Sequence, residues 1–415
     1  MAIRSLLTLR RFTLLVAIAL TAASALVLVV RATHAGGLWR DEAGAVQVAL
    51  QPSMHGIAQV FQHEAFPLLF PLTVRAYAAV AGTSDTAFRI YGLLVGLALI
   101  ATLWMTSRAI TQTVPLLSIA LLGLNPSVLE WAGSIRGYGM GTVLMLVTMG
   151  LIWRVVTAPI WWIVGLTAIA AICSVQTLYY NAVMLFAVTI AGAAVAARNR
   201  HWKRVLLVIG IGAVAAVSLT PYAFVLRNAD WTNIITLPYF PFSLFRVKLF
   251  EPLASAGPAL GRVWLWLAAG GIGAGVAAQV HGSSSQQNGI RDASLYCLIA
   301  LLVAVPAYFV FLKILRYPTQ PWYYIALMGL MAVALEGGLA AVPWPWWKHW
   351  GRAALAGAIG LVSFMPAWET AHVRQTPMDL VAAQLEKRAT SGDVIVVAPW
   401  YLGISFDRYY KALRL

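Results

Sequence analysis

The chain has 415 residues, of which 61% are hydrophobic and only 10% are Asp, Glu, Lys or Arg. Soluble globular domains are about half apolar and about a quarter charged, so this composition, with a mean hydropathy of +0.79, excludes an ordinary soluble protein. The net charge of +15 is dispersed, without a basic helix or an aromatic-basic repeat, which excludes a nucleic-acid groove; no nucleic-acid partner is expected.

Apolar runs of about 17 or more residues, long enough to cross a bilayer as helices, recur along nearly the whole chain. Membrane strands would alternate polar and apolar residues, and these runs do not. Cys173 and Cys297 fall inside such runs, which makes a disulfide framework or a zinc site unexpected. The sequence has no P-loop pattern, the nucleotide-binding motif that an ATP-driven pump would need. The fold class indicated is an all-α polytopic membrane protein.

The first run, Phe12 to Val30, follows Arg10-Arg11 and exceeds the ~7–15 apolar residues of a signal peptide. We interpret it as a transmembrane helix with a cytoplasmic N-terminus, in a multi-pass protein integral to the inner (plasma) membrane. Residues 32–84 then form a large first outer loop. Within it, residues 65–82 are apolar. However, Pro67, Pro71 and Arg75 favour an interfacial helix that lies along the membrane over a helix that spans it.

About eleven transmembrane helices are expected in total. After the first, they are predicted at 87–107, 114–130, 138–156, 159–175, 178–197, 204–226, 261–280, 293–313, 321–342 and 353–368. This topology puts the dense basic cluster from Arg198 to Arg204 inside, as the positive-inside rule requires. Of the 14 acids, all but Asp292 and Glu336 then fall outside. That crowding places the expected chemistry on the outer face.

The pattern changes after residue 368. Residues 1–368 are therefore interpreted as the transmembrane domain, with the site in loop 32–84, and residues 369–415 as a short extracytoplasmic segment. Asp379 to Thr390 predicts an amphipathic helix, and Val394 to Ala398 a buried-type strand, which together would make a small α/β element. About 45 residues are too few to fold alone, so this segment either packs on the outer loops or is truncated.

The first candidate site is Asp41-Glu42, just after the first membrane exit and beside Trp39 and Arg40. A positioned carboxylate is a sufficient base for a sugar or lipid hydroxyl that attacks an activated carbon. Adjacent residues do not share a helix face, so one acid can face a substrate while the other is held structurally. The alternative for both is a helix N-terminal acid stabilised by the backbone dipole.

Three further clusters lie on the predicted outer side. His63 could donate to a phosphate or, with Glu64, contribute to a metal site; a solvated turn is the alternative. Glu130 and Arg136 lie in one loop, where Arg136 can hold a phosphate or simply snorkel.

Lys313 and Arg316 at another outer junction could complete a cationic cradle with Arg136, or anchor a helix end. Tyr179 could line the same cavity, although a core polar contact is its alternative.

In chain order these features resemble the polytopic C-type glycosyltransferase superfamily. The resemblance is to its bacterial branch of protein O-mannosyltransferases, the aminoarabinose transferase of lipid A, and related galacturonosyl and mannosyl transferases. The motifs that carry it are Trp39-Arg40-Asp41-Glu42, His63 to Leu68, Ala87-Phe88-Arg89, Arg136-Gly137-Tyr138, Arg316-Tyr317 and Gly392-Asp393-Val394.

The resemblance implies transfer of a sugar from a polyprenyl-phosphate sugar to a lipid, glycan or protein acceptor on the outer side. Asp41, with Glu42 beside it, is the expected base, and Arg136, Tyr138, Lys313, Arg316 and His63 are expected around the donor phosphate. Glu64, Glu130 and Tyr179 are expected in acceptor-binding or secondary roles. A divalent metal ion is a possible cofactor.

Two other classes remain open. A flippase or transporter would carry polar or charged residues within its spans, where Glu336 is the one clear acid. A glycan ligase or polymerase is poorly separated from a monosaccharide transferase by sequence.

Overall fold

The computed structural model describes residues 2–60, 66–222, 236–281, 288–342, 344, 346–390 and 392–411. The long apolar runs form helices, because backbone groups in a membrane must satisfy their hydrogen bonds internally. Within the described residues, nine segments are long and apolar enough to cross a membrane. They are Arg11–His34 of α1 (Ala2–His34), α5 (Asp85–Thr111), α8 (Gly137–Thr157), α10 (Asn181–Arg198), Trp202–Tyr222 with α11 (Trp202–Val217), α15 (Pro258–His281), α16 (Asn288–Leu315), Pro321–Ala340 with η3 (Pro321–Tyr324) and α17 (Ile325–Ala340), and α18 (Arg352–His372).

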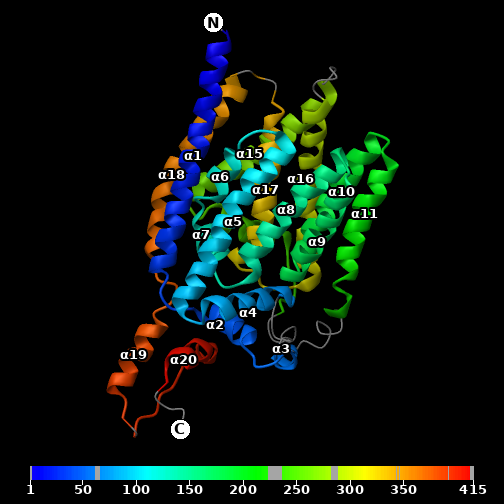
Figure 1. Ribbon diagram of the computed structural model, residues 1–415. Coiled ribbons are helices and arrows are strands. Elements are labelled where there is room, and N and C mark those ends of the chain that lie inside the picture. Colours follow the sequence, from blue (N-terminus) through cyan, green and yellow to red (C-terminus); the bar gives the residue numbers. More distant parts are fainter. Residues whose placement is uncertain are drawn as a thin grey trace.

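The bundle is built around α17, in which every residue from Ile325 to Leu339 is buried. Helices α8, α15 and α16 pack against it, while α10 joins α16 to α11. Helices α1 and α18 pack together along one edge, as Figure 1 shows. The short helix η4 (Trp347–Gly351) contacts both of them. The all-α polytopic fold expected from the sequence is confirmed.

Among the described residues, two of the eleven expected spans do not appear as helices of 18 residues or more. Residues 114–130 form two short helices, α6 (Leu117–Leu122) and α7 (Pro126–Ala132), rather than one span. The break has a local cause: Asn125 caps α7 through its side-chain oxygen, Pro126 begins that helix, and the Asn125 amide donates to the Pro252 carbonyl in α14 (Phe242–Leu253). The other segment, 159–175, corresponds to α9 (Trp161–Thr177), an apolar helix of 17 residues.

The loop expected on the outer side, residues 32–84, contains α2 (Arg40–Ala49), α3 (Met54–Val60) and α4 (Leu69–Ala81). In Figure 1 they lie across the end of the bundle far from the start of α1. A second hydrophobic cluster, which includes Leu38, Val46, Phe70, Val74 and Phe88, attaches α2 and α4 to the start of α5. Helix α4 agrees with the interfacial helix expected within residues 65–82.

The segment after α18 contains α19 (Met378–Arg388), η5 (Trp400–Leu402) and α20 (Gly403–Tyr409). The expected strand from Val394 to Ala398 was wrong: these residues are irregular, and the Val394 and Val396 side chains are 87% and 81% exposed. A continuous run of β-branched residues favours a strand only where a partner strand can pair with it. Among the described residues the β-pairing is a single bridge, between Gly36 and Thr376.

Candidate active site

Asp41 and Glu42 lie in the first turn of α2, where the helix dipole favours negative charge. The Glu42 carboxylate reaches back to accept a hydrogen bond from the Trp39 backbone N–H at 3.2 Å, which fixes the start of the helix. Because successive helical residues point in different directions, the two carboxylates have different surroundings.

Glu42 is fully buried and paired. Its Oε1 accepts from Arg89 Nη1 at 2.8 Å and from the Ile135 backbone N–H at 3.0 Å. Arg89, on α5, also donates to the carbonyls of Gly36 and Gly37. This buried pair therefore joins α2, α5 and the loop before α8, and it fixes the backbone on both sides of Asp41.

Asp41 keeps part of its carboxylate accessible, with 20% of the side chain exposed. Arg40 Nε lies 2.6 Å from its Oδ1, and the Arg40 guanidinium also covers the ring of Tyr401. On the inner side, Arg136 donates to the Asp41 backbone carbonyl at 3.2 Å. Asp41 is thus partly exposed, with its carboxylate paired to Arg40 and its backbone carbonyl bonded to Arg136.

Arg136 occupies the N-cap position of α8, and 7% of it is exposed. Its guanidinium lies over the rings of Phe66 and Tyr138, at 4.8 and 6.0 Å from their centroids. The Tyr138 hydroxyl interacts electrostatically with Arg136, Asp41 and Tyr317. The structure therefore brings three of the residues expected from sequence, Asp41, Arg136 and Tyr138, into one site.

An aromatic cluster that the sequence analysis did not single out borders this site. Trp39, Trp131 and Trp322 come from the start of α2, from α7 and from η3, with ring centroids 4.4 to 5.7 Å apart. All three rings are partly exposed. Only the fold shows that they meet, because 283 positions (322 − 39) separate the first from the last.

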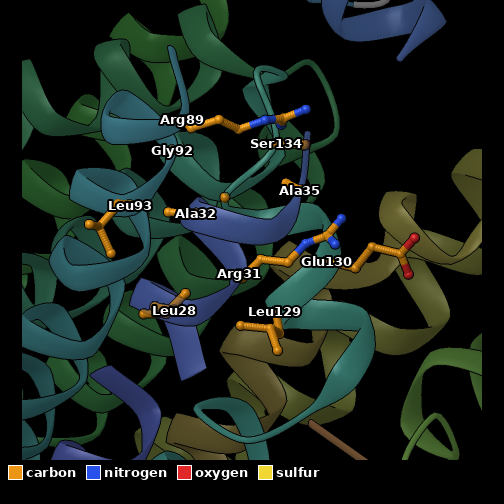
Figure 2. A pocket seen from close by; sticks show the side chains of 11 residues that line it. Leu28, Arg31, Ala32, Ala35, Arg89, Gly92, Leu93, Leu129, Glu130 and Ser134 are labelled. Carbon is orange, nitrogen blue, oxygen red and sulfur yellow. The ribbon is translucent and has the colours of Figure 1, made fainter. Parts of the chain in front are cut away.

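Glu130 borders a pocket between α1, α5 and α7, which also contains Arg31 and Arg89 (Figure 2). The pocket holds about 20 Å³, room for about one water molecule and too little for a sugar. Arg31 donates to the carbonyls of Val373 and Thr370 and so ties α1 to the end of α18. Burial raises the pKa of Glu130, and the Arg31 charge opposes that rise.

The C-terminal segment is fastened to the loop that leads into α2. The Leu38 backbone N–H donates to the Tyr409 hydroxyl at 2.5 Å, and that hydroxyl donates to Asp85 Oδ2 at 2.6 Å. Arg408 pairs with the same carboxylate at 2.6 Å. Burial, together with the bond to Asp85, raises the pKa of the Tyr409 hydroxyl, so it remains a donor at neutral pH.

For the other residues expected from sequence, no contact with Asp41 is seen where the structure describes them. The side chains of Lys313 and Arg316 are exposed at the end of α16, where the Arg316 carbonyl accepts from the Leu237 N–H at 2.6 Å. Tyr179 packs edge-on against Tyr222, with centroids 5.7 Å apart. His63 and Glu64 lie outside the described residues. Across the described ranges, no group of three or more metal-binding side chains was found.

No protein-family profile and no curated protein matches the sequence. Solved structures do. ArnT from Cupriavidus metallidurans, crystallised with undecaprenyl phosphate, superimposes with a TM-score of 0.59 at 13% identity, covering 95% of this chain and 85% of ArnT. The Archaeoglobus fulgidus oligosaccharyltransferase crystallised with Zn and sulfate gives 0.53 at 12% identity, covering 90% of this chain. AglB of that organism, in complex with an inhibitory peptide and a dolichol-phosphate, gives 0.51 at 10% identity and 95% coverage.

This chain spans only 56% and 63% of those two archaeal proteins. At such identities the likeness concerns the fold alone, which this chain shares with ArnT and with the archaeal oligosaccharyltransferases.

Proposed function

We propose that the protein is a membrane glycosyltransferase that moves a sugar from a polyprenyl-phosphate donor to an acceptor on the extracytoplasmic face. The observation that carries the proposal is the partly exposed Asp41 carboxylate, fixed by a buried ion pair at its neighbour and set beside Arg136. The shared fold with ArnT, whose structure contains undecaprenyl phosphate, supports a lipid-phosphate partner.

The transfer step needs a base and a place for negative charge. Asp41 takes the proton of the acceptor hydroxyl as its oxygen forms a bond to the anomeric carbon of the sugar. The bond from that carbon to the phosphate oxygen breaks, and the electron pair leaves with the lipid phosphate. A fixed cation near that phosphate stabilises the developing charge, and we assign this role to Arg136, with the Tyr138 hydroxyl beside it.

The donor's lipid chain requires an apolar path to this site. A groove of about 350 Å³ is lined by apolar residues of α9, α10 and α11, beginning at Val175. This end of the groove lies close to Arg136. Two residues after Val175, the Thr177 carbonyl packs against Gly137, the neighbour of Arg136. A Cβ added at Gly137 would lie 2.7 Å from that carbonyl oxygen. We assign the groove to isoprenoid units, and Lys313 and Arg316 to attraction of the anionic donor.

The transporter alternative loses its main sequence signal. Glu336 is fully buried and pairs with Arg352, while its Oε2 accepts from the backbone N–H groups of Leu116 and Ser118 at 3.0 and 2.9 Å. These partners identify Glu336 as the group that fixes the start of α6. An acid so bound does not mark an open pathway.

The test uses purified protein in lipid and a panel of radiolabelled polyprenyl-phosphate sugars, with a membrane extract as acceptor source. We expect one donor to release polyprenyl phosphate in step with label transfer. The panel also includes a lipid-linked oligosaccharide as donor, which tests whether the protein is a glycan ligase. Transfer from that donor alone would contradict a monosaccharide transferase, and no release from any donor would contradict glycosyl transfer.

A further inference from the structure

A large cavity lies between the start of α9 and the turn from α10 to α11. In Figure 1 these elements meet at the end of the bundle opposite α2. Its volume is about 770 Å³, in the range of small-molecule sites in proteins. Its lining combines apolar and basic side chains, including Trp161, Val164, Arg200, Lys203, Arg204 and Leu207.

The cavity is positively charged, and none of the described residues that line it is an acid. Arg204 is held in place by the carbonyls of Val156 and Thr157 at the end of α8, at 2.6 and 3.1 Å. The side chains of Arg200 and Lys203 are exposed, and neither forms a hydrogen bond or ion pair with any residue that the structure describes. An acid nearby in the fold, Asp292, accepts from Asn199 at 2.7 Å.

Arg200 occupies a backbone position that suits glycine. It ends α10 with φ of +57°, in the left-handed region. The Arg200 N–H donates to the Ala197 carbonyl and the His201 N–H to the Ala196 carbonyl, both at 2.9 Å. These two bonds define a Schellman turn, in which glycine is preferred at this position. A cation therefore stands where the turn favours a residue without a side chain, which points to a role for that side chain.

The walls of the cavity are suited to lipid. Trp161 is 86% exposed and Trp202 65% exposed, and Leu206 beside them is 71% exposed. Tryptophans are enriched where membrane helices reach the lipid headgroups. A ligand in this cavity would place its charge against the cations and an apolar portion against the Trp161 and Leu207 side.

We propose that this cavity binds the phosphate of an anionic phospholipid from the leaflet at this end of the bundle. Basic pockets between transmembrane helices bind such headgroups, and the membrane-facing tryptophans extend the contact to the acyl chains. The site is independent of the proposed sugar transfer. Its occupant would fasten α9, α10 and α11 together at the membrane surface.

The test is a thermal-shift titration of the purified full chain in a neutral detergent. The probes are short-chain phosphatidylglycerol, short-chain phosphatidylcholine and inorganic phosphate. We expect phosphatidylglycerol to stabilise the protein at a concentration roughly tenfold below that needed for phosphatidylcholine, with no effect of inorganic phosphate alone. Arg200→Gly and Lys203→Gln should each raise the phosphatidylglycerol midpoint roughly fivefold.

Arg108→Gln is the matched control, because Arg108 lies in the last turn of α5 at the same end but outside the cavity. It should leave the midpoint unchanged. Without lipid, Arg200→Gly should melt no lower than the parent chain, because glycine suits the turn. Equal stabilisation by both lipids, unchanged midpoints in the two cavity variants, or a matching effect of inorganic phosphate would overturn the proposal. A lower melting temperature of Arg200→Gly without lipid would also overturn it, because Arg200 would then serve the turn.

Discussion

At the scale of single residues, neighbouring acids divide two tasks between them. Glu42 has no exposed surface and forms bonds to Arg89, Ile135 and Trp39. One oxygen of the Asp41 carboxylate is paired with Arg40, and 20% of the Asp41 side chain is exposed. A base must reach the proton that it removes. Of the two carboxylates, only that of Asp41 is exposed enough to do so. We therefore assign positioning to Glu42 and proton transfer to Asp41.

Removing the Glu42 charge tests this division. Glu42→Gln leaves the Arg89 guanidinium buried without its counter-charge, so we expect the free energy of unfolding to fall by about 3 kcal/mol. Denaturant unfolding of the purified protein measures it. Asp407→Asn, at an exposed outer acid of α20, is the control and should change stability by less than about 0.5 kcal/mol. A Glu42→Gln protein as stable as the control would show that the pair does not hold the loop.

At the scale of elements, the C-terminal segment acts as a latch on the loop before α2. Tyr409 links Leu38 to Asp85, and the Gln375 N–H donates to the Ala35 carbonyl at 2.8 Å. The latch therefore fixes the backbone from Ala35 to Leu38, three residues before Asp41. Small displacements of a reacting group reduce turnover strongly, so this contact bears on catalysis without touching substrate.

Tyr409→Phe removes the hydroxyl that links Leu38 and Asp85. We expect a loss of about 1 kcal/mol in stability and a roughly tenfold lower kcat with little change in KM. Steady-state release of polyprenyl phosphate gives both constants. Tyr410→Phe, whose ring stacks on Phe406 in the same segment, is the matched control. Equal turnover of the two variants would count against the latch.

Elements also show where sequence reasoning succeeded and where it failed. Hydropathy located all nine span segments, because burial in lipid leaves a long continuous pattern. It joined α6 to α7, because averaging over a window conceals one capping residue, Asn125. It predicted a strand at Val394, where no partner strand occurs among the described residues. The acid pair could be found from its position, but the role of Glu42 depends on Arg89, 47 residues away.

At the scale of the whole molecule, we infer the membrane orientation from the distribution of charge. Arg198, Arg200, Lys203 and Arg204 lie at the end of the bundle far from α2, which the positive-inside rule assigns to the cytoplasm. Asp41, Asp85 and Asp379 lie at the other end. A lipid-linked donor suits an outer site, because nucleotide sugars are not supplied outside the cell.

Surface labelling tests this orientation. Ser53→Cys, between α2 and α3, should react in intact cells with a membrane-impermeant maleimide, whereas Ala158→Cys, between α8 and α9, should react only after permeabilisation. The parent chain is the blank, because Cys173 and Cys297 lie within helices of the bundle. The reverse pattern would put Asp41 on the cytoplasmic side and remove the reason for a lipid-linked donor.

The most direct measurement compares polyprenyl phosphate release by the parent chain, Asp41→Asn and Asp407→Asn, each with its accepted donor and acceptor. We predict that Asp41→Asn melts like the parent but loses release by at least about a hundredfold, because an amide cannot take the proton. Asp407→Asn should retain full activity. Release by Asp41→Asn at the parent rate would contradict the assignment of Asp41 as the base.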